Sequence, residues 1–371
     1  MDSIGVLKTL IIQNFLLTVK LRVVMYKYGI IRHVEICACI LILIIFSALS
    51  SGCTTESNEQ NGDNSSIAII QTSGEVVNLP SVANRIVLLN GNGAEILYLI
   101  GAGEKVVGVS NEIAVHPERG KLFPNAVNVG DWMTPNIELI SELKPDVIIA
   151  FNSMKPKNLD LIEDTGIPVV YIDCYRPTLM VGDVMALGIL SGNYSQAEEF
   201  VIFYTGIMDN ISETTKNIPD WPIVYCERTS AYTGMGKGSG MDILLNISGG
   251  ENVMDVSMGE KGTLSPEWVV TKDPDVIIKT ITADSNLSYE YYNLISREGF
   301  STMKAVKNNR TWILYNNVAY GPRSFAGAVV VAKMLHPIEF ADISVEDLLR
   351  DYNDKYGFSF EYEGMYYPNF F

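Results

Sequence analysis

The chain has 371 residues and carries 27 Lys and Arg against 43 Asp and Glu, a formal net charge of −16. Nucleic-acid phosphate and anionic lipid repel so acidic a chain, which argues against nucleic-acid binding. The length suggests two domains, and the 47% apolar and 19% charged fractions exclude bulk disorder.

The N-terminus carries an export signal. Residues 36–49 (ICACILILIIFSAL) are uncharged and follow Lys27 and Arg32. This stretch is shorter than the roughly 20 residues of a membrane span and fits the apolar core of a signal peptide. Small residues precede Cys53, an arrangement that resembles a lipoprotein signal in which this Cys becomes the lipidated first residue. We therefore predict a signal peptide over 1–52, with Met25 as an alternative start and a retained anchor helix as the alternative to lipidation.

A polar segment follows the signal. Residues 54–66 (TTESNEQNGDNSS) show no periodicity, so we predict a lipid anchor and flexible tether over 53–75. Without residues 1–52 the chain keeps 22 basic and 41 acidic residues, a net charge of −19. The exported body is thus more acidic than the whole chain.

The body alternates short apolar runs with helical patterns, which predicts parallel α/β structure. An N-terminal lobe is expected over 76–178, a connecting helix over 179–217, a C-terminal lobe over 218–357 and a tail over 358–371. The predicted strands are 85–90, 106–110, 146–151, 169–173, 222–227, 275–280 and 311–316. The predicted helices outside the connection are 93–101, 135–143, 240–248, 265–272, 289–306, 324–335 and 344–356.

The two lobes contain an internal repeat. Residues 93–109 align without gaps on 240–256, with eight identities in 17 positions, and Glu95 falls on Asp242. Residues 135–151 and 266–280 form a second pair in the same order. The fold class predicted is therefore α/β, with two similar parallel-sheet lobes joined by one long rigid helix.

These segments resemble the substrate-binding proteins of ABC importers for iron–siderophores and cobalamin. The resemblance rests on residues 84–110, 129–151, 236–253 and 266–279, and it spans about 76–356. It implies a monomeric, non-enzymatic receptor outside the cytoplasm, tethered to the membrane, which delivers a ligand from an interlobe cleft to a permease dimer with a cytoplasmic ATPase. It also implies one acidic docking residue on each lobe, and Glu95 and Asp242 are the candidates.

Ligands of parallel α/β lobes gather at the carboxyl ends of the strands. Arginines there could bind carboxylate or catecholate oxygens, tyrosines could stack on the ligand, and a Tyr320 phenolate could bind ferric iron. The alternative is that the arginines neutralise neighbouring acids and the aromatics cap the core. The candidates are Tyr175, Arg176, Arg228, Tyr232, Tyr320 and Arg323, and Trp132 joins them by resemblance.

We expect metal to arrive inside a chelate and not to be bound directly by the protein. After residue 52 only His116 and His336 remain as histidines, and Cys174 and Cys226 are best read as buried free thiols. No intrinsic cofactor is expected. The three arginines favour a ferric chelate over the alternatives, which are a corrinoid such as cobalamin, haem, or a surface sensor of such a ligand. A nitrogenase-like oxidoreductase would need more cysteines at strand ends than this chain has.

Overall fold

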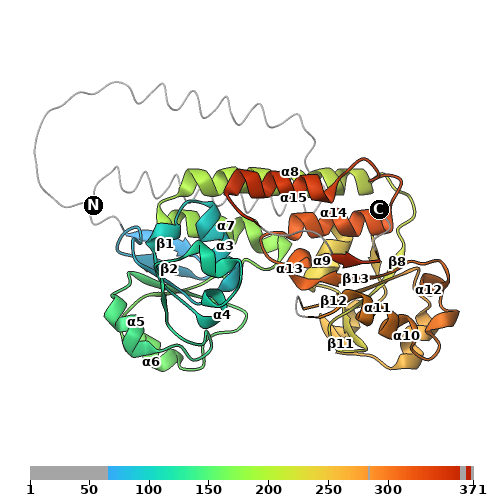
Figure 1. Cartoon of the computed structure of the whole chain (residues 1–371), viewed down its shortest axis with the longest axis horizontal. Coiled ribbons are helices and arrows are strands. Elements are labelled where there is room, and N and C mark those ends of the chain that lie inside the picture. Colours follow the sequence, from blue (N-terminus) through green and yellow to red (C-terminus); the bar gives the residue numbers. More distant parts are fainter. Residues whose placement is uncertain (1–65, 283–284, 360–364, 369–371) are drawn as a thin grey trace, which may run out of the picture. The chain divides into compact units, whose positions relative to one another are not determined.

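A computed structural model describes residues 66–282, 285–359 and 365–368 of the protein (Figure 1). The predicted signal peptide, the alternative start at Met25, the lipid-attachment residue Cys53 and most of the predicted tether lie outside the described residues. Among the helices of the described part, none has both the length and the apolar character to cross a membrane.

The N-terminal lobe is built on a parallel sheet. Its described strands lie in the order β5-β4-β3-β6-β7, and all neighbours run parallel. The four strands predicted for this lobe are present, and all of their carboxyl ends therefore lie at one edge. The strands are β3 (Ile86–Leu88), β4 (Val106–Val109), β5 (Val127–Asn128), β6 (Val147–Ala150) and β7 (Val169–Tyr171). The helices are α3 (Gly91–Leu99), α4 (Asn111–Ala114), α5 (Ile137–Leu143) and α6 (Leu159–Glu163), with 3₁₀ turns η1 (Gly103–Lys105) and η2 (Arg119–Leu122).

A hairpin precedes this lobe. Strand β1 (Ile67–Ile70) pairs antiparallel with β2 (Val76–Leu79), and Ile69 is fully buried. The prediction of a flexible tether up to residue 75 is wrong for residues 67–75. The apolar residues of β1 become buried only when they pack on the folded lobe. The polar residues that precede β1 in the sequence do not indicate this burial.

The connecting segment is helical, as predicted, but it contains two helices. Helix α7 (Pro177–Ser191) ends at Gly192, whose φ of 75° is left-handed, and α8 (Tyr194–Thr215) follows directly. Glycine adopts this conformation without the cost that a Cβ imposes, so it reverses the chain and lets α7 pack on α8. At 22 residues, α8 is about 33 Å long and is the helix that runs between the lobes (Figure 1).

The C-terminal lobe has a mixed sheet. The three predicted strands β8 (Ile223–Glu227), β12 (Val276–Ile281) and β13 (Thr311–Tyr315) form its parallel centre. Gly299, with φ of 80°, divides the predicted helix 289–306 into separate elements. The other described strands are β9 (Thr233–Met235), β10 (Glu251–Asn252), β11 (Lys261–Thr263) and β14 (Tyr366–Tyr367). The helices are α9 (Gly240–Ile247), α10 (Pro266–Lys272), α11 (Leu287–Ile295), α12 (Lys304–Lys307), α13 (Asn316–Ala319), α14 (Ser324–Leu335) and α15 (Val345–Tyr356), with 3₁₀ turns η3 (Val256–Met258) and η4 (Phe300–Thr302).

The internal repeat is visible in the structure. Helices α5 and α10 both have seven residues, and both end at a left-handed residue, Lys144 with φ of 46° and Asp273 with φ of 43°. Each is followed by a central strand, β6 or β12. The second repeat pair of the sequence thus forms the same helix, turn and strand in each lobe.

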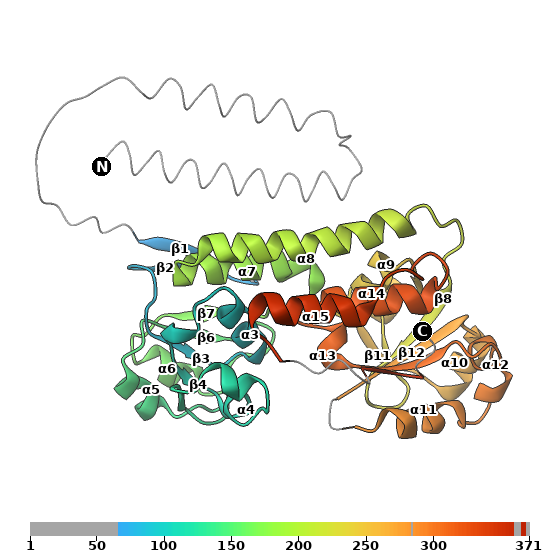
Figure 2. The same cartoon turned by 45° about the horizontal axis from the view of Figure 1, so that its top comes forward.

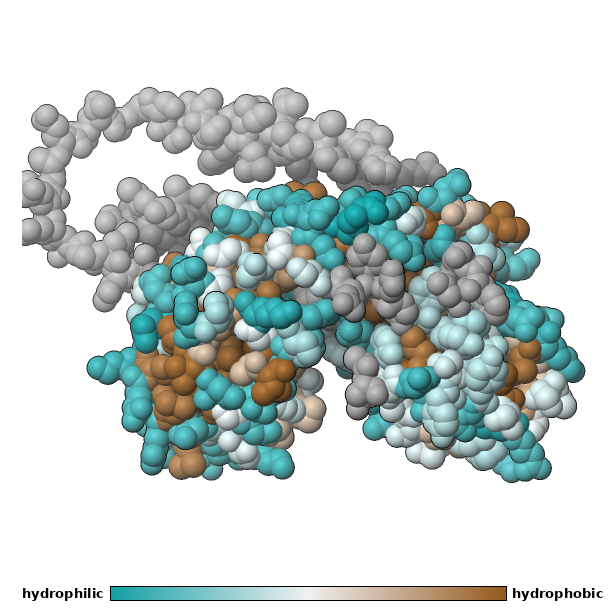
Figure 3. Space-filling view, in the orientation of Figure 1, coloured by the Kyte–Doolittle hydropathy of each residue, from teal (hydrophilic) through white to brown (hydrophobic). Residues whose placement is uncertain are grey.

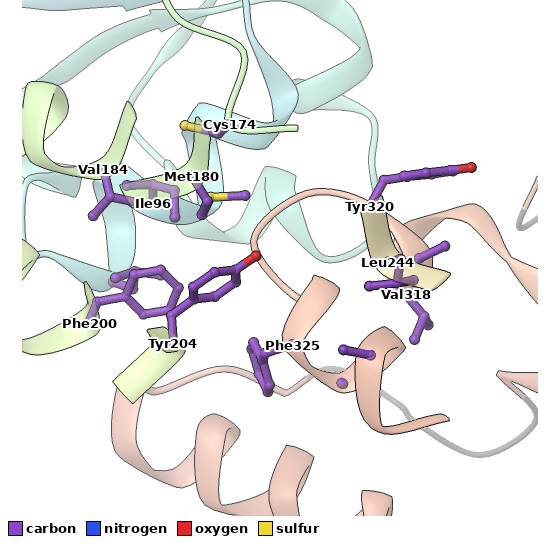
Figure 4. Close-up of a cluster of buried hydrophobic side chains, with 14 of the residues drawn as sticks. Ile96, Cys174, Met180, Val184, Phe200, Tyr204, Leu244, Val318, Tyr320 and Phe325 are labelled. Atoms are coloured by element: carbon purple, nitrogen blue, oxygen red, sulfur yellow. The ribbon is translucent and has the colours of Figure 1, made fainter. Parts of the chain in front are cut away.

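One hydrophobic core runs through both lobes. It includes Leu88 of the N-terminal sheet and Leu314 of the C-terminal sheet. Figure 4 shows Phe200 and Tyr204 of α8 beside Phe325 of α14, with Ile96 of α3 and Met180 of α7 in the same cluster. The lobes are therefore joined by packed side chains as well as by a backbone connection.

The C-terminal segment contacts both lobes. Phe358, just after α15, packs on Tyr98 of α3 with 5.2 Å between ring centroids. Strand β14 pairs antiparallel with β13, so Tyr366 and Tyr367, which were predicted to lie in a tail, belong to the C-terminal sheet. Figure 2 shows α15 lying near α8 across the lobes.

Candidate ligand-binding site

Two tyrosines meet where the lobes meet. Tyr175 follows β7 of the N-terminal lobe and Tyr320 follows α13 of the C-terminal lobe, and their rings stack with centroids 4.8 Å apart at 24°. The backbone N–H of Gly321 donates to the Tyr175 carbonyl over 3.2 Å. A Cβ at Gly240 would lie 3.1 Å from the Tyr320 ring, so a glycine at the start of α9 leaves room for the stack. Figure 3 shows the surface hollowed between the lobes.

The two phenols differ in exposure. Tyr175 is 37% exposed, whereas Tyr320 is 9% exposed and its hydroxyl donates to Sδ of Met235 over 2.9 Å. Burial raises the pKa of Tyr320 far above its ordinary value, so the group is a neutral phenol. The prediction that a Tyr320 phenolate binds ferric iron does not fit this environment. Tyr175 is the ring of the pair that a ligand could reach.

The three predicted arginines have three different environments. Arg176 forms a fork with Glu260, with Nη2 to Oε2 at 2.8 Å and Nη1 to Oε1 at 3.3 Å. Arg323 is 6% exposed and its Nε lies 3.4 Å from Glu95 Oε1. Of the three arginines, Arg323 and Arg176 therefore follow the alternative given above, in which the arginines neutralise neighbouring acids.

Arg228 follows β8 and is exposed, and its guanidinium contacts no hydrogen-bonding or acidic group of the described residues. Its charge lies close enough to Tyr175 and Tyr320 to oppose the rise in their pKa that burial causes. The structure thus gathers Tyr175, Tyr320, Arg176 and Arg228 in one place, as the strand-end argument predicted.

A buried charge network holds the loop that carries Arg228. Glu227 has no exposed surface and accepts two hydrogen bonds from Arg297, of 2.7 and 2.9 Å. It also lies 3.4 Å from Lys279 and accepts from the Tyr232 backbone N–H over 2.9 Å. The Tyr232 ring lies under the Arg297 guanidinium at 4.8 Å, with backbone φ of 57°. Sequence reasoning missed Glu227, although an acid ending a buried apolar strand is the signal for such a network.

Trp132 is half-buried on the N-terminal lobe. It packs edge-on against Phe151, 5.3 Å between ring centroids. Within the described residues neither Trp132 nor Tyr232 stacks on the Tyr175–Tyr320 pair.

Both predicted docking acids are buried. Glu95 is 1% exposed and accepts from the Tyr352 hydroxyl over 2.7 Å, and Asp242 is 5% exposed and accepts from the Gly238 N–H over 2.9 Å. A docking residue must reach its partner, so this role does not fit Glu95 and Asp242, which instead stabilise contacts between elements. The sequence pattern placed them in equivalent helices but did not show which face is covered.

The second repeat pair contains exposed equivalents. Glu138 in the first turn of α5 and Glu267 in the first turn of α10 are both exposed. Each stands six residues before the left-handed residue that ends its helix, Lys144 or Asp273. Structurally these two carboxylates are counterparts, and the second repeat was the sequence signal that identifies them.

The described residues contain no group of three or more His, Cys, Asp and Glu placed to hold a metal ion. His116 Nδ1 accepts backbone N–H groups of Glu118 and Arg119, and His336 Nε2 lies 2.8 Å from the Gly249 carbonyl oxygen. Cys174 and Cys226 are buried free thiols, as predicted, and burial raises the pKa of both.

Comparison with known proteins gives a consistent picture. A family model described as periplasmic binding protein matches residues 86–317. An uncharacterized ABC transporter substrate-binding lipoprotein of Bacillus subtilis is 25% identical over 317 residues, 81% of this chain and 97% of that protein. A vitamin B12-binding protein of Yersinia pestis is 27% identical over 206 residues, 55% of this chain and 72% of that protein. A molybdate periplasmic binding protein of Haemophilus influenzae shares the fold with a TM-score of 0.65 at 20% identity, covering 80% of this chain and 99% of that one.

Proposed function

The chain belongs to the periplasmic binding protein family, the non-enzymatic solute-binding components of ABC transporters, and on that premise we propose that its ligand is a corrinoid held between the lobes. The observation that carries this proposal is the Tyr175–Tyr320 stack with one uncommitted guanidinium, that of Arg228, beside it. A corrinoid is a bulky macrocycle with neutral amide arms and a single phosphodiester. An exposed aromatic ring suits the macrocycle and one guanidinium suits the phosphodiester.

Two features that favoured a ferric chelate are weaker in the folded protein. Arg323 and Arg176 are paired with Glu95 and Glu260, and Tyr320 is a neutral phenol. Of the three arginines that the sequence predicted for the site, only Arg228 therefore remains available to a strongly anionic chelate. The Yersinia pestis relative, which is named for vitamin B12, also supports the corrinoid.

A ferric chelate remains the second candidate. The Arg176–Glu260 pair is solvent-accessible, with 39% and 52% of the side chains exposed, and the pair can open. Opening would add a second guanidinium to Arg228 at the same place.

The ligand is tested by titrating the purified protein with cyanocobalamin, haemin, ferric citrate and a ferric siderophore, with quenching of its tryptophans as the signal. We expect cyanocobalamin to bind most tightly, and Tyr175→Ala to weaken it about tenfold through loss of ring contact. Tyr289→Ala is the matched control, because Tyr289 is 67% exposed on α11 and takes no part in the stack. Binding of ferric chelates alone, or equal loss in both variants, would refute the corrinoid site.

We also propose how the receptor meets its partners. Permease docking falls to Glu138 and Glu267, the exposed and structurally equivalent carboxylates of the two lobes. A transporter with two like permease subunits can offer each acid an equivalent basic pocket. The monomer is held near the permease by lipidated Cys53 or by an N-terminal anchor helix.

A further inference from the structure

We propose that Glu260 sets the charge selectivity of the interlobe site, because it neutralises Arg176 and so disfavours strongly anionic chelates. This inference rests on the proposed function, since it concerns which metal chelates the same site accepts.

The Arg176–Glu260 pair joins the two lobes across the site. Arg176 lies just before α7, and Glu260 lies between η3 and β11. The guanidinium makes the fork of 2.8 and 3.3 Å described above, and its Nη1 also lies 3.5 Å from the Gly238 carbonyl oxygen. The carboxylate thus comes from one lobe and the arginine from the other.

The backbone around Glu260 is held in place. The Glu260 carbonyl accepts from the Gly236 N–H over 3.1 Å. A Cβ at Gly236 would lie 2.2 Å from the Gly259 carbonyl oxygen, so the two segments approach as closely as glycine allows. A Cβ at Gly238, whose φ is 85°, would lie 3.5 Å from Glu260 Oε1. The backbone that carries Glu260 is therefore positioned beside Arg176, and the exposed carboxylate reaches it from there.

Two positive charges act on the Tyr175 phenol, and one of them remains without an acidic partner in the described residues. Arg176 and Arg228 both lie near the Tyr175 ring, and Glu260 cancels one of them. Nearby Asp242 is balanced by Lys237 at 3.8 Å, and Glu227 by its partners inside the lobe. A ligand with one anionic group matches this surplus, whereas further negative groups are repelled by the Glu260 carboxylate.

A ligand can influence the Arg176–Glu260 pair but not the Arg323–Glu95 pair. The side chains of Arg323 and Glu95 are 8% and 1% exposed, so their charges stay paired whatever occupies the cleft. Arg176 and Glu260 are 39% and 52% exposed, so removing the carboxylate releases a guanidinium without leaving a buried charge.

The test compares wild type, Glu260→Gln and Glu260→Ala in titrations with cyanocobalamin and with a strongly anionic ferric tris-catecholate. We expect both variants to bind the tris-catecholate about fivefold more tightly, a gain that shrinks at high salt, and to bind cyanocobalamin as wild type does. Glu251→Gln, an exposed acid on β10 of the same lobe, is the control and should change neither affinity. Adding Arg176→Ala to Glu260→Gln should abolish the gain.

The outcomes separate the two proposals. If the chelates bind but Glu260→Gln leaves their ratio unchanged, the selectivity role is wrong and the receptor function stands. If the ratio changes equally in Glu251→Gln, the effect is one of net charge and the role of Glu260 is again wrong. If none of the chelates binds to any form that melts like wild type, the proposed function fails and this inference fails with it.

Discussion

Glu95 illustrates how a residue's neighbours decide its role. Its carboxylate lies on α3 and meets Tyr352 of α15 and Arg323 before α14. Removing one partner of such a buried pair typically costs about 3–5 kcal/mol, because the other charge is left without compensation. Glu95, an acid inside the apolar run GAEILYLIG, therefore stabilises the contacts of α3 with α15 and with the start of α14.

His116 gives a prediction about acid stability. Burial, followed by the positive charges of Arg119 and Arg323, lowers its pKa to about 4. The unfolded chain takes up this proton near pH 6.5 and the folded protein only near pH 4, so stability should be lost as the pH falls through that window. Urea unfolding at pH 7 and pH 4.5 should show a larger loss for wild type than for His116→Asn, whose amide oxygen can accept the same backbone N–H groups.

Asp183 titrates in an overlapping window with the opposite sign. Burial raises its pKa to about 6, so this group costs stability as the pH rises from its unfolded value towards 6. Asp183 is present in both wild type and His116→Asn, so its contribution cancels when the pH-dependent losses of stability of the two proteins are compared. Identical pH slopes in the two proteins would contradict the effect assigned to His116.

At the scale of elements, Gly192 decides that the connection is two helices. Its φ of 75° is left-handed, and a Cβ there would lie 2.9 Å from Val82 Cγ1. Gly192→Ala should therefore lower the free energy of unfolding by about 1–2 kcal/mol. Denaturant unfolding measures the change.

Gly206 is the matched control within α8. A Cβ there meets no atom within 4 Å, and the residue stands in a helix interior. Gly206→Ala should raise stability by up to about 1 kcal/mol, because alanine is the better helix former. If the two variants changed stability in the same direction, the helix break at Gly192 would lose its explanation.

At the scale of the whole molecule, the shared core restricts motion between the lobes. Side chains of both sheets, α8, α14 and α15 belong to one cluster, and Tyr98–Phe358 adds a contact from the C-terminal segment. Close-packed interiors resist continuous deformation, so large lobe closure would have to break this packing. The stiffness expected of a single helix is thus supplied by several elements together.

Docking to the permease also involves the whole molecule, because both lobes must contact it at once. Glu138→Lys with Glu267→Lys should abolish transport in cells while leaving the ligand affinity of the purified protein unchanged. The single reversals should have intermediate effects, since each removes one of two contacts. Glu104→Lys, an exposed acid on η1, is the control. Transport that survives the double reversal, or a loss of ligand affinity, would refute this docking surface.

The sequence by itself determined the class of the protein. Apolar runs, glycine turns and an internal repeat are local signals, and they predicted seven of the described strands and the two-lobe α/β fold. They also predicted the strand-end location of Tyr175, Arg176, Arg228 and Tyr320. The same local signals also predicted the protein family, because the motifs that mark this family are short segments of the chain.

Only the tertiary structure decided which of these residues a ligand or partner can reach. Arg323 and Glu95, or Arg176 and Glu260, are far apart in sequence, and no pattern along the chain shows that they pair. Burial is likewise set by what packs from outside, as when Tyr352 of α15 covers Glu95. Charge and position along a strand are properties of the sequence, whereas exposure and partnership arise from contacts between distant segments. Of the three predicted arginines, these contacts leave Arg228, beside the two stacked tyrosines, without an acidic partner in the described residues.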